Sequence, residues 1–122
     1  KRDRIDDAIC ATRAALIDGY VPGGGTTLMY ISQEAETSND KGYSLLMAAI
    51  QQPFKKILEN ANVNHDAIIK IGYGYNVITE KNEDFYKEGI IDPTKVIKTC
   101  VENAVSIATT VLSTKCIISS NR

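Results

Sequence analysis

A proline followed by three glycines, from Pro22 to Gly25, constrains the fold of this chain more than any other feature. A helix does not run through such a segment, because proline removes a backbone N–H and each glycine costs about 1 kcal/mol in a helix interior. On both sides, over residues 3–18 and 26–34, apolar residues recur at helical spacing. The sequence therefore predicts a helix that stops at Gly19, a tight loop and a second helix.

Helical signals also dominate the middle of the chain. Apolar spacing predicts helices over residues 43–51 and 53–61 and a short one over 65–71. Pro53 fits the first turn of its helix, where the missing N–H costs nothing.

Short β segments are predicted in two places. Residues 72–79 combine glycine with aromatic and β-branched residues, which is typical of a small hairpin. Residues 116–118 form a short β run that requires a partner strand, either the hairpin or another segment. The predicted fold class is mainly α, with a small β hairpin and a C-terminal strand.

The longest helix is expected to begin at Asp92, with Asp92 as N-cap and Pro93 in the first position. Apolar residues cover so much of residues 97–112 that we expect this helix to be buried on most sides. In the charged segment 80–88 that precedes it, Phe85 and Tyr86 are the expected anchors.

Composition excludes several classes of protein. The chain has 122 residues, is 43% hydrophobic and 24% charged, and fits one globular domain. A net charge of −1 leaves no basic surface for nucleic acid or an anionic membrane, and no apolar run approaches the roughly 20 residues that span a bilayer. Three scattered cysteines and one histidine offer no zinc spacing, so we expect no metal site and three free, buried thiols: Cys10, Cys100 and Cys116.

The residues alone give only weak signals for chemistry. The loop 22–25 is either a plain tight turn or a backbone contact for phosphate, and it lacks the Gly-Lys-Ser/Thr of a P-loop. Asp6 and Asp7 are either solvated first-turn carboxylates or ligands for water or metal. Since they lie about 100° apart on the helix, they cannot act as a catalytic pair.

The remaining candidates favour structural roles. Asp92 is first a helix cap, although one oxygen could still accept a ligand hydroxyl. His65, Lys55 and Lys56 are expected to be surface residues.

Four motifs in order carry a family resemblance. They are DDAICATRAA at residues 6–15, GYVPGGG at 19–25, YGYN at 73–76 and GIIDPTKV at 89–96. Together they resemble the group I chaperonins, and the likeness extends from Lys1 to Ser119. The resemblance implies an intermediate-domain helix over residues 1–18 and the C-terminal half of an equatorial ATP-binding domain over 19–122.

The resemblance also implies roles for individual residues. Asp7 is similar to the carboxylate that promotes attack of water on the γ-phosphate, and Gly24 to a glycine that contacts the nucleotide. The other residues implied to bind the nucleotide lie around the base and the ribose: Asn76, Val77, Ile78, Ile90 and Asp92.

As a whole protein, such a chaperonin would use ATP and Mg²⁺ to encapsulate unfolded clients, in heptameric rings with a small co-chaperonin. ATP and Mg²⁺ would be held mainly by an N-terminal half that lies outside this sequence, so we expect the chain alone to be inactive. Lysine outnumbers arginine 10 to 4 and isoleucine is abundant, which suggests an AT-rich genome. Together with the resemblance, this favours an organelle matrix, a mitochondrion before a plastid, with the bacterial cytoplasm as the alternative.

The sequence departs from the family pattern at several points. The glycine-rich stretch before Tyr73 is short, residues 62–65 lack the acidic pair that helps two rings meet, and Pro22 replaces a small residue. The alternative function is a stand-alone helical interaction module without nucleotide chemistry, which predicts a monomer with no exposed apolar face. A small phosphotransferase is disfavoured, because the glycines are accompanied neither by a phosphate-loop lysine nor by a histidine nucleophile.

Overall fold

The computed structural model describes residues 2–36, 38–63 and 71–116. The helices are α1 (Arg2–Asp18), α2 (Thr26–Glu34), α3 (Lys41–Ile50), α4 (Gln52–Asn60) and α5 (Thr94–Ser113). The strands are β1 (Tyr20–Pro22), β2 (Tyr73–Asn76), β3 (Lys81–Asp84) and β4 (Ile91–Pro93). The prediction of a mainly α fold with a small hairpin is confirmed.

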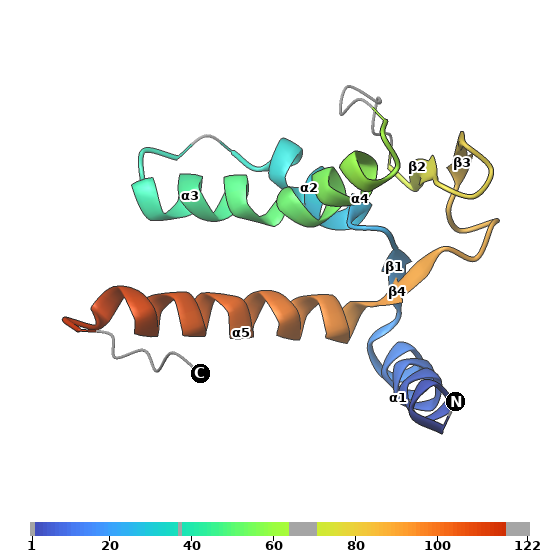
Figure 1. Ribbon diagram of the computed structural model, residues 1–122, viewed down its shortest axis with the longest axis horizontal. Helices are drawn as coiled ribbons and strands as arrows, with labels where there is room; N and C mark the ends of the chain where they lie inside the picture. The colour runs from blue at the N-terminus through green and yellow to red at the C-terminus, as the bar shows by residue number, and fades with distance from the viewer. Residues whose placement is uncertain (1, 37, 64–70, 117–122) are drawn as a thin grey trace, which may run out of the picture.

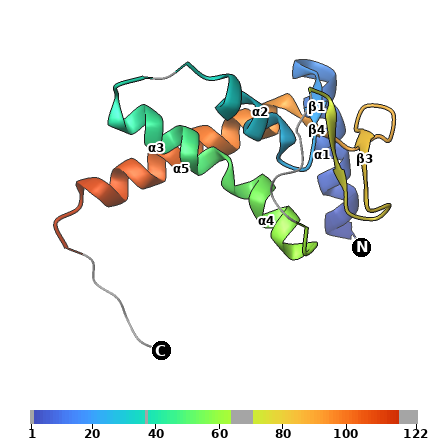
Figure 2. The ribbon, with the colours of Figure 1, turned by 90° about the horizontal axis from the view of Figure 1, so that it is seen from above.

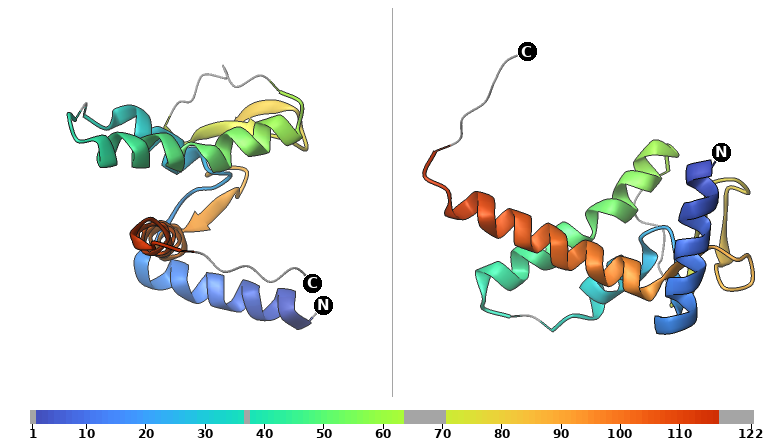
Figure 3. Two further views of the ribbon diagram at one scale, coloured as in Figure 1. Left: turned by 60° about the vertical axis from the view of Figure 1, so that its left-hand side comes forward. Right: turned by 90° about the horizontal axis from the view of Figure 1, so that it is seen from below.

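The elements form two layers joined by a short ribbon of two strands (Figure 1). Helices α2, α3 and α4 contact one another and form the upper layer with the hairpin. Helices α1 and α5 pack against each other and against β4 in the lower layer. Figure 3 shows α5 end-on, with α1 beside it and the ribbon rising to the upper layer. Seen from above, the hairpin lies at the end of the molecule where α1 begins, away from the far end of α5 (Figure 2).

The helices follow the sequence pattern closely. Helix α2 covers the predicted residues 26–34, and α1, α3 and α4 begin and end within two residues of their predicted bounds. Gly19 ends α1 with φ 78°, a left-handed conformation that suits glycine. At the start of α3, the Asp40 carboxylate accepts the Tyr43 N–H at 3.0 Å, which satisfies one of the free donors of the first turn.

A small core lies in the upper layer. The buried hydrophobic side chains among the described residues are Phe54 and Leu58 of α4 and Phe85, which follows β3. Thr26, at the start of α2, is buried beside them. A Cβ at Gly25 would lie 2.8 Å from the Phe54 nitrogen, so glycine lets the start of α2 approach α4.

The ribbon between the layers changes one sequence expectation. Strand β1 pairs antiparallel with β4, with Val21 opposite Asp92, and Thr94 N–H donates to Gly19 O at 3.1 Å. The prediction that Asp92 is the N-cap of α5 is therefore wrong. The cap position is taken by Pro93 without a side-chain hydrogen bond, because pairing with β1 keeps Asp92 in an extended strand.

The hairpin is longer than predicted. Strand β2 pairs with β3, so the second strand falls in the charged segment KNED rather than within residues 72–79. Phe85 is an anchor as predicted, but Tyr86 stays 49% exposed and meets Tyr20 edge-on, with ring centroids 6.1 Å apart.

Helix α5 is far more exposed than predicted. None of its residues is buried, and only Thr94, Ile97 and Val101 are half-buried, at the end where α1 crosses. The apolar pattern identifies a face but not a covering partner, and the described residues supply none for the C-terminal part of the helix. For the same reason the prediction of buried thiols is wrong, since Cys10, Cys100 and Cys116 are all free and exposed.

Two expectations fall almost wholly outside the described residues: the helix over 65–71 with His65, and the strand over 116–118. Of these segments the structure describes only Ile71, which is in a turn, and Cys116, which is in no regular element. The expected surface position of the α4 lysines is confirmed for Lys56, which pairs with Glu59 at 3.0 Å, whereas Lys55 is half-buried. In the parts of the chain that the structure describes, no helix combines the length and apolar character that crossing a membrane requires.

Candidate nucleotide site

The glycine loop between β1 and α2 is a well-defined turn. Gly24 and Gly25 both adopt positive φ, 62° and 75°, which other residues adopt only with strain. The side chains of the two threonines that follow form hydrogen bonds with carbonyl groups of the loop. Thr26 Oγ1 donates to Gly23 O at 2.8 Å, and Thr27 Oγ1 donates to Pro22 O at 2.7 Å. The loop therefore has a fixed shape rather than being a loose glycine linker.

Two adjacent amides of this loop are free to bind a ligand. Among the described residues, no acceptor receives the N–H of Gly24 or Gly25. Both lie at the N-terminus of α2, where the free N–H groups and the helix dipole attract anions. The loop can therefore act as a donor pair for a phosphate oxygen.

Asp92 lies directly against the loop, although it is far away in the sequence. Gly23 N–H donates to Ile90 O at 2.9 Å, which extends the β1–β4 pairing into the loop. A Cβ at Gly23 would lie 3.3 Å from both Cγ and Oδ2 of Asp92. Because residue 23 is glycine, the Asp92 carboxylate can lie at the same end of the ribbon as the amides of Gly24 and Gly25.

Phe85 connects the hairpin to the same loop. A Cβ at Gly24 would lie 3.3 Å from Cε2 of the Phe85 ring, and one at Gly74 would lie 2.6 Å from the same atom. The ring is 2% exposed and fills the space between the loop and β2. This packing holds the hairpin, and with it Asn76, at the loop.

The side chain of Asn76 is ordered by the hairpin itself. It is only 9% exposed, and its Nδ2 donates to Glu83 Oε2 at 2.8 Å. Its Oδ1 accepts the Ile78 N–H at 3.0 Å. The two residues that follow in the turn point outward, with Val77 47% and Ile78 89% exposed.

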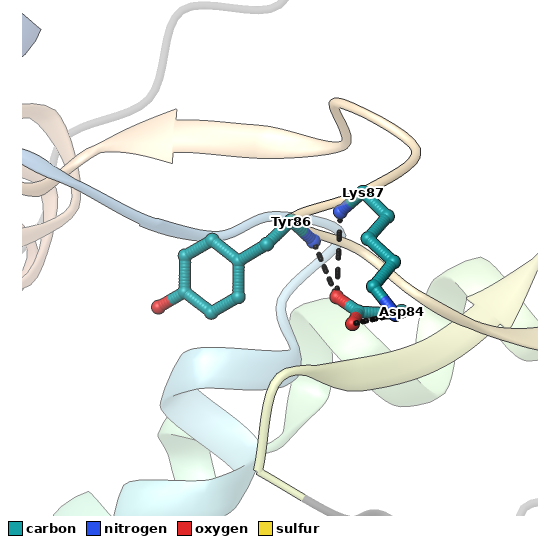
Figure 4. Close-up of polar contacts among 3 residues, drawn as sticks. All are labelled: Asp84, Tyr86 and Lys87. Atoms are coloured by element: carbon teal, nitrogen blue, oxygen red, sulfur yellow. Dashed lines mark hydrogen bonds and ion pairs between the residues drawn. The ribbon is translucent and has the colours of Figure 1, made fainter.

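The segment from β3 to β4 is fixed by Asp84. Its Oδ1 accepts the backbone N–H groups of Tyr86 at 3.1 Å and Lys87 at 3.3 Å, and Oδ2 lies 3.7 Å from Lys87 Nζ (Figure 4). Ile90 N–H then donates to Phe85 O at 2.9 Å. These bonds set the path by which the chain reaches Ile90 and Asp92.

Asp7 is not brought to this cluster. It is exposed on α1, eleven residues before Asp18 and so about 16 Å along the helix axis from the C-terminal end of α1. The structure thus places Ile90 and Asp92 against the loop that contains Gly24, and Phe85 joins the hairpin of Asn76 to that loop. Asp7 stays on a separate helix. The roles assigned to these residues by resemblance stay predictions.

A shallow cavity of about 190 Å³ lies beside the loop. It is lined by Pro22, Thr26 and Thr27 together with three tyrosines: Tyr30, Tyr73 and Tyr86. None of the predicted nucleotide residues lines it. No group of three or more His, Cys, Asp or Glu side chains within the described ranges could hold a metal ion.

Sequence reasoning did not connect four residues with the site, although it had named one of them, Phe85, as an anchor. Thr26 and Thr27 had a signal, since hydroxyls just after a loop commonly bond to its carbonyls. No sequence signal indicated the other two contacts, which join Phe85 to Gly24 and Glu83 to Asn76. Both depend on the β2–β3 register and on packing between segments that are distant in sequence.

Comparison with known families identifies the family of the chain. The chain matches the TCP-1/cpn60 chaperonin family over residues 1–122. The glycine loop, the hairpin and Asp92 all lie inside the match. The chain therefore belongs to the TCP-1/cpn60 chaperonin family, whose members assist the folding of other proteins.

Proposed function

We propose that this chain contributes one side of an ATP-binding and ATP-hydrolysing site in a ring-forming chaperonin. The observation that carries the proposal is the pairing of β1 with β4, which puts Asp92 against the loop that has two free amides. A carboxylate beside an anion-binding loop suits a nucleotide, which joins a polyphosphate to a sugar with hydroxyl groups. In this proposal residues 1–18 belong to an intermediate domain and residues 19–122 to an equatorial domain.

Each residue has a distinct role in the proposed site. The Gly24 region donates backbone N–H groups to phosphate oxygens. Asp92 accepts a hydrogen bond from a ribose hydroxyl, and Asn76 offers its amide to the base. Val77, Ile78 and Ile90 provide apolar contacts around the base. The exposure of Val77 and Ile78 leaves both available to a ligand.

Asp7 is the proposed catalytic residue. When α1 brings it to the γ-phosphate, its carboxylate takes a proton from the attacking water, whose oxygen bonds to phosphorus as the bond to the ADP oxygen breaks. Mg²⁺ would neutralise phosphate charge, and its ligands would come mainly from outside this chain. Asp7 is exposed on α1 and so is available for such an approach.

The exposed apolar faces support association with other protein surfaces. Ile5, Leu16 and Ile17 on α1 are 60%, 82% and 72% exposed, and Leu112 on α5 is 80% exposed. We propose that they are covered in a heptameric ring that acts on unfolded clients with a small co-chaperonin. The proposed location is an organelle matrix, mitochondrial before plastid, with the bacterial cytoplasm as the alternative.

The same faces argue against the alternative of a stand-alone interaction module. That function predicts a monomer without exposed apolar surface, whereas α1 and α5 both carry such surface. The free amides of the loop also have no role in a module without nucleotide chemistry.

The test compares two neighbouring carboxylates of α1 in the complete protein encoded by the gene. Asp7→Ala is expected to lower ATP turnover by about 100-fold or more, because a general base is lost, while ATP binding is kept. Asp6→Ala is the matched control and should change turnover less than twofold. ATP binding is measured by calorimetry and turnover by phosphate release. Equal turnover in the wild type and Asp7→Ala would contradict the assignment, and the 122-residue chain alone should show negligible turnover.

A further inference from the structure

The hydrogen bond between Asn76 and Glu83 is the least expected polar contact of the hairpin. Nδ2 of Asn76 donates to Glu83 Oε2 at 2.8 Å, in a part-buried setting. Neither residue lies directly opposite the other, since Asn76 pairs with Lys81 and Gly74 pairs with Glu83. The contact is therefore a diagonal one between residues on the same face of the hairpin.

Glycine at position 74 makes the diagonal contact possible. Glu83 faces a residue without a side chain, so its own side chain has no direct cross-strand partner and can lean toward Asn76. The space above Gly74 is already filled, because a Cβ there would lie 2.6 Å from the Phe85 ring and 2.7 Å from Thr26 Cγ2. Position 74 thus stays glycine, and the carboxylate of Glu83 reaches the amide.

The two bonds of Asn76 fix the orientation of its amide. A carboxylate only accepts hydrogen bonds, so the end of the amide that faces Glu83 must be NH₂. The Ile78 N–H only donates, so the end that faces it must be the oxygen. Flipping the amide would break both bonds. Within the described part of the chain, one N–H of Nδ2 and one lone pair of Oδ1 have no partner and could serve a ligand.

With its orientation fixed, the Asn76 amide presents a donor and an acceptor that match a 6-amino purine. An asparagine amide pairs with adenine by accepting from the 6-amino group and donating to the adjacent ring nitrogen. A 6-oxo purine presents an acceptor where adenine presents a donor. A free amide can flip to suit either base, whereas a fixed amide suits one orientation.

We propose that Glu83 is a positioning residue that fixes the Asn76 amide and so makes the base subsite select a 6-amino purine over a 6-oxo purine. The proposal rests on the proposed nucleotide-binding function. Glu83 acts through Asn76 and touches no reacting atom, so it tunes which base binds and leaves the hydrolysis step unchanged.

The experiment measures the dissociation constants of ATP and inosine triphosphate, which differ only at position 6 of the base and its adjacent ring nitrogen. It uses the complete protein and calorimetry. Glu83→Ala removes the acceptor that orients the amide and should lower the preference for ATP by about fivefold or more. Glu83→Gln still offers an oxygen to Nδ2 and should keep the preference within about threefold of the wild type. Glu88→Ala, which removes an exposed carboxylate from the next turn, is the matched control and should change nothing.

The outcomes separate the two proposals. Wild-type protein that binds ATP, with the same preference in Glu83→Ala, would overturn the role of Glu83 and leave the function standing. An equal loss of preference in Glu83→Gln and Glu83→Ala would also overturn it, because the cause would be charge and not amide orientation. Wild-type protein that binds neither nucleotide would overturn both proposals. Circular dichroism of each variant verifies the fold.

Discussion

The upper layer around the glycine loop and the lower layer of α1 and α5 differ in how they use apolar residues. In the upper layer, Phe54, Leu58 and Phe85 are at most 2% exposed and surround the start of α2. In the lower layer no described residue of α1 or α5 is buried, and the half-buried residues of α1 include three alanines, at positions 11, 14 and 15. Both layers are apolar in sequence, but only one has a core of its own.

The difference separates two tasks within one chain. The upper layer holds the loop, the hairpin and Asp92 in fixed relation by contacts among the described residues. The lower layer presents apolar helix faces whose burial depends on another protein surface. The site geometry should therefore depend on upper-layer packing, and assembly should depend on the lower layer.

The largest effect is expected when the same change, leucine to alanine, is made in the upper layer and in the lower layer. Leu58→Ala removes a side chain with 0% exposure and should lower the free energy of unfolding by about 3–5 kcal/mol, because it leaves a cavity. Leu112→Ala, at a residue 80% exposed, should change it by less than about 0.5 kcal/mol. Urea denaturation of the 122-residue chain measures both. Similar losses in the two variants would show that α5 is packed in the chain by itself.

A second test breaks the contact between the hairpin and the loop. Gly74→Ala puts a Cβ 2.6 Å from the Phe85 ring and should cost about 3 kcal/mol of stability through overpacking. Phe85→Leu removes the ring atoms involved, so the double variant should lose less than the sum of the single losses. Thermal denaturation of the wild type, the two single variants and the double variant measures this double-mutant cycle. Strict additivity would mean that the two residues do not meet.

A smaller effect is expected at the turn that leads from the upper layer to the ribbon. Asp84→Ala removes the acceptor of two backbone N–H groups and should cost about 1 kcal/mol. Lys87→Ala loses only an exposed ion pair at 3.7 Å and should cost less than about 0.5 kcal/mol. If Lys87→Ala costs as much as Asp84→Ala in urea denaturation, the ion pair and not the turn geometry stabilises the segment.

The smallest effect on stability should come with the largest effect on association. Charges placed on the exposed face by Val111→Glu and Leu112→Glu together should change the free energy of unfolding by less than about 0.5 kcal/mol. They should also reduce binding of the dye ANS and self-association, since they interrupt an apolar face. Light scattering after size-exclusion chromatography measures association. A wild-type chain that is a clean monomer without ANS binding would contradict the proposed assembly surface.

Local sequence signals predicted the helices well. Gly19, Pro53 and the loop 22–25 set boundaries that any packing must respect, and α2 occupies its predicted range. The strands were harder. Lys81–Asp84 has no β-forming composition and becomes a strand only because it pairs with Tyr73–Asn76.

The site was only partly predictable for the same reason. The pairing of Val21 with Asp92 decides that Asp92 faces the loop and does not cap α5, and pairing between distant segments leaves no local trace. Burial of α5 could not be predicted either, because an apolar stripe indicates which side of a helix avoids water but not which surface covers it. The contact of Glu83 with Asn76 follows from register, which single residues do not encode.

The left-handed turn at Gly19 has a mechanical consequence for α1. Gly19 is followed at once by the paired strand β1, so it is the joint about which a rigid α1 can turn. Asp7 lies twelve residues before this joint, about 18 Å along the helix axis, so each degree of rotation would displace Asp7 by about 0.3 Å and 30° would displace it by about 9 Å. The contacts of α1 with α5 and β4 bury no side chain of either helix completely, so such a rotation would expose only partly buried surface. A change of backbone angles at Gly19 alone would thus move Asp7 by several ångströms without changing the glycine loop.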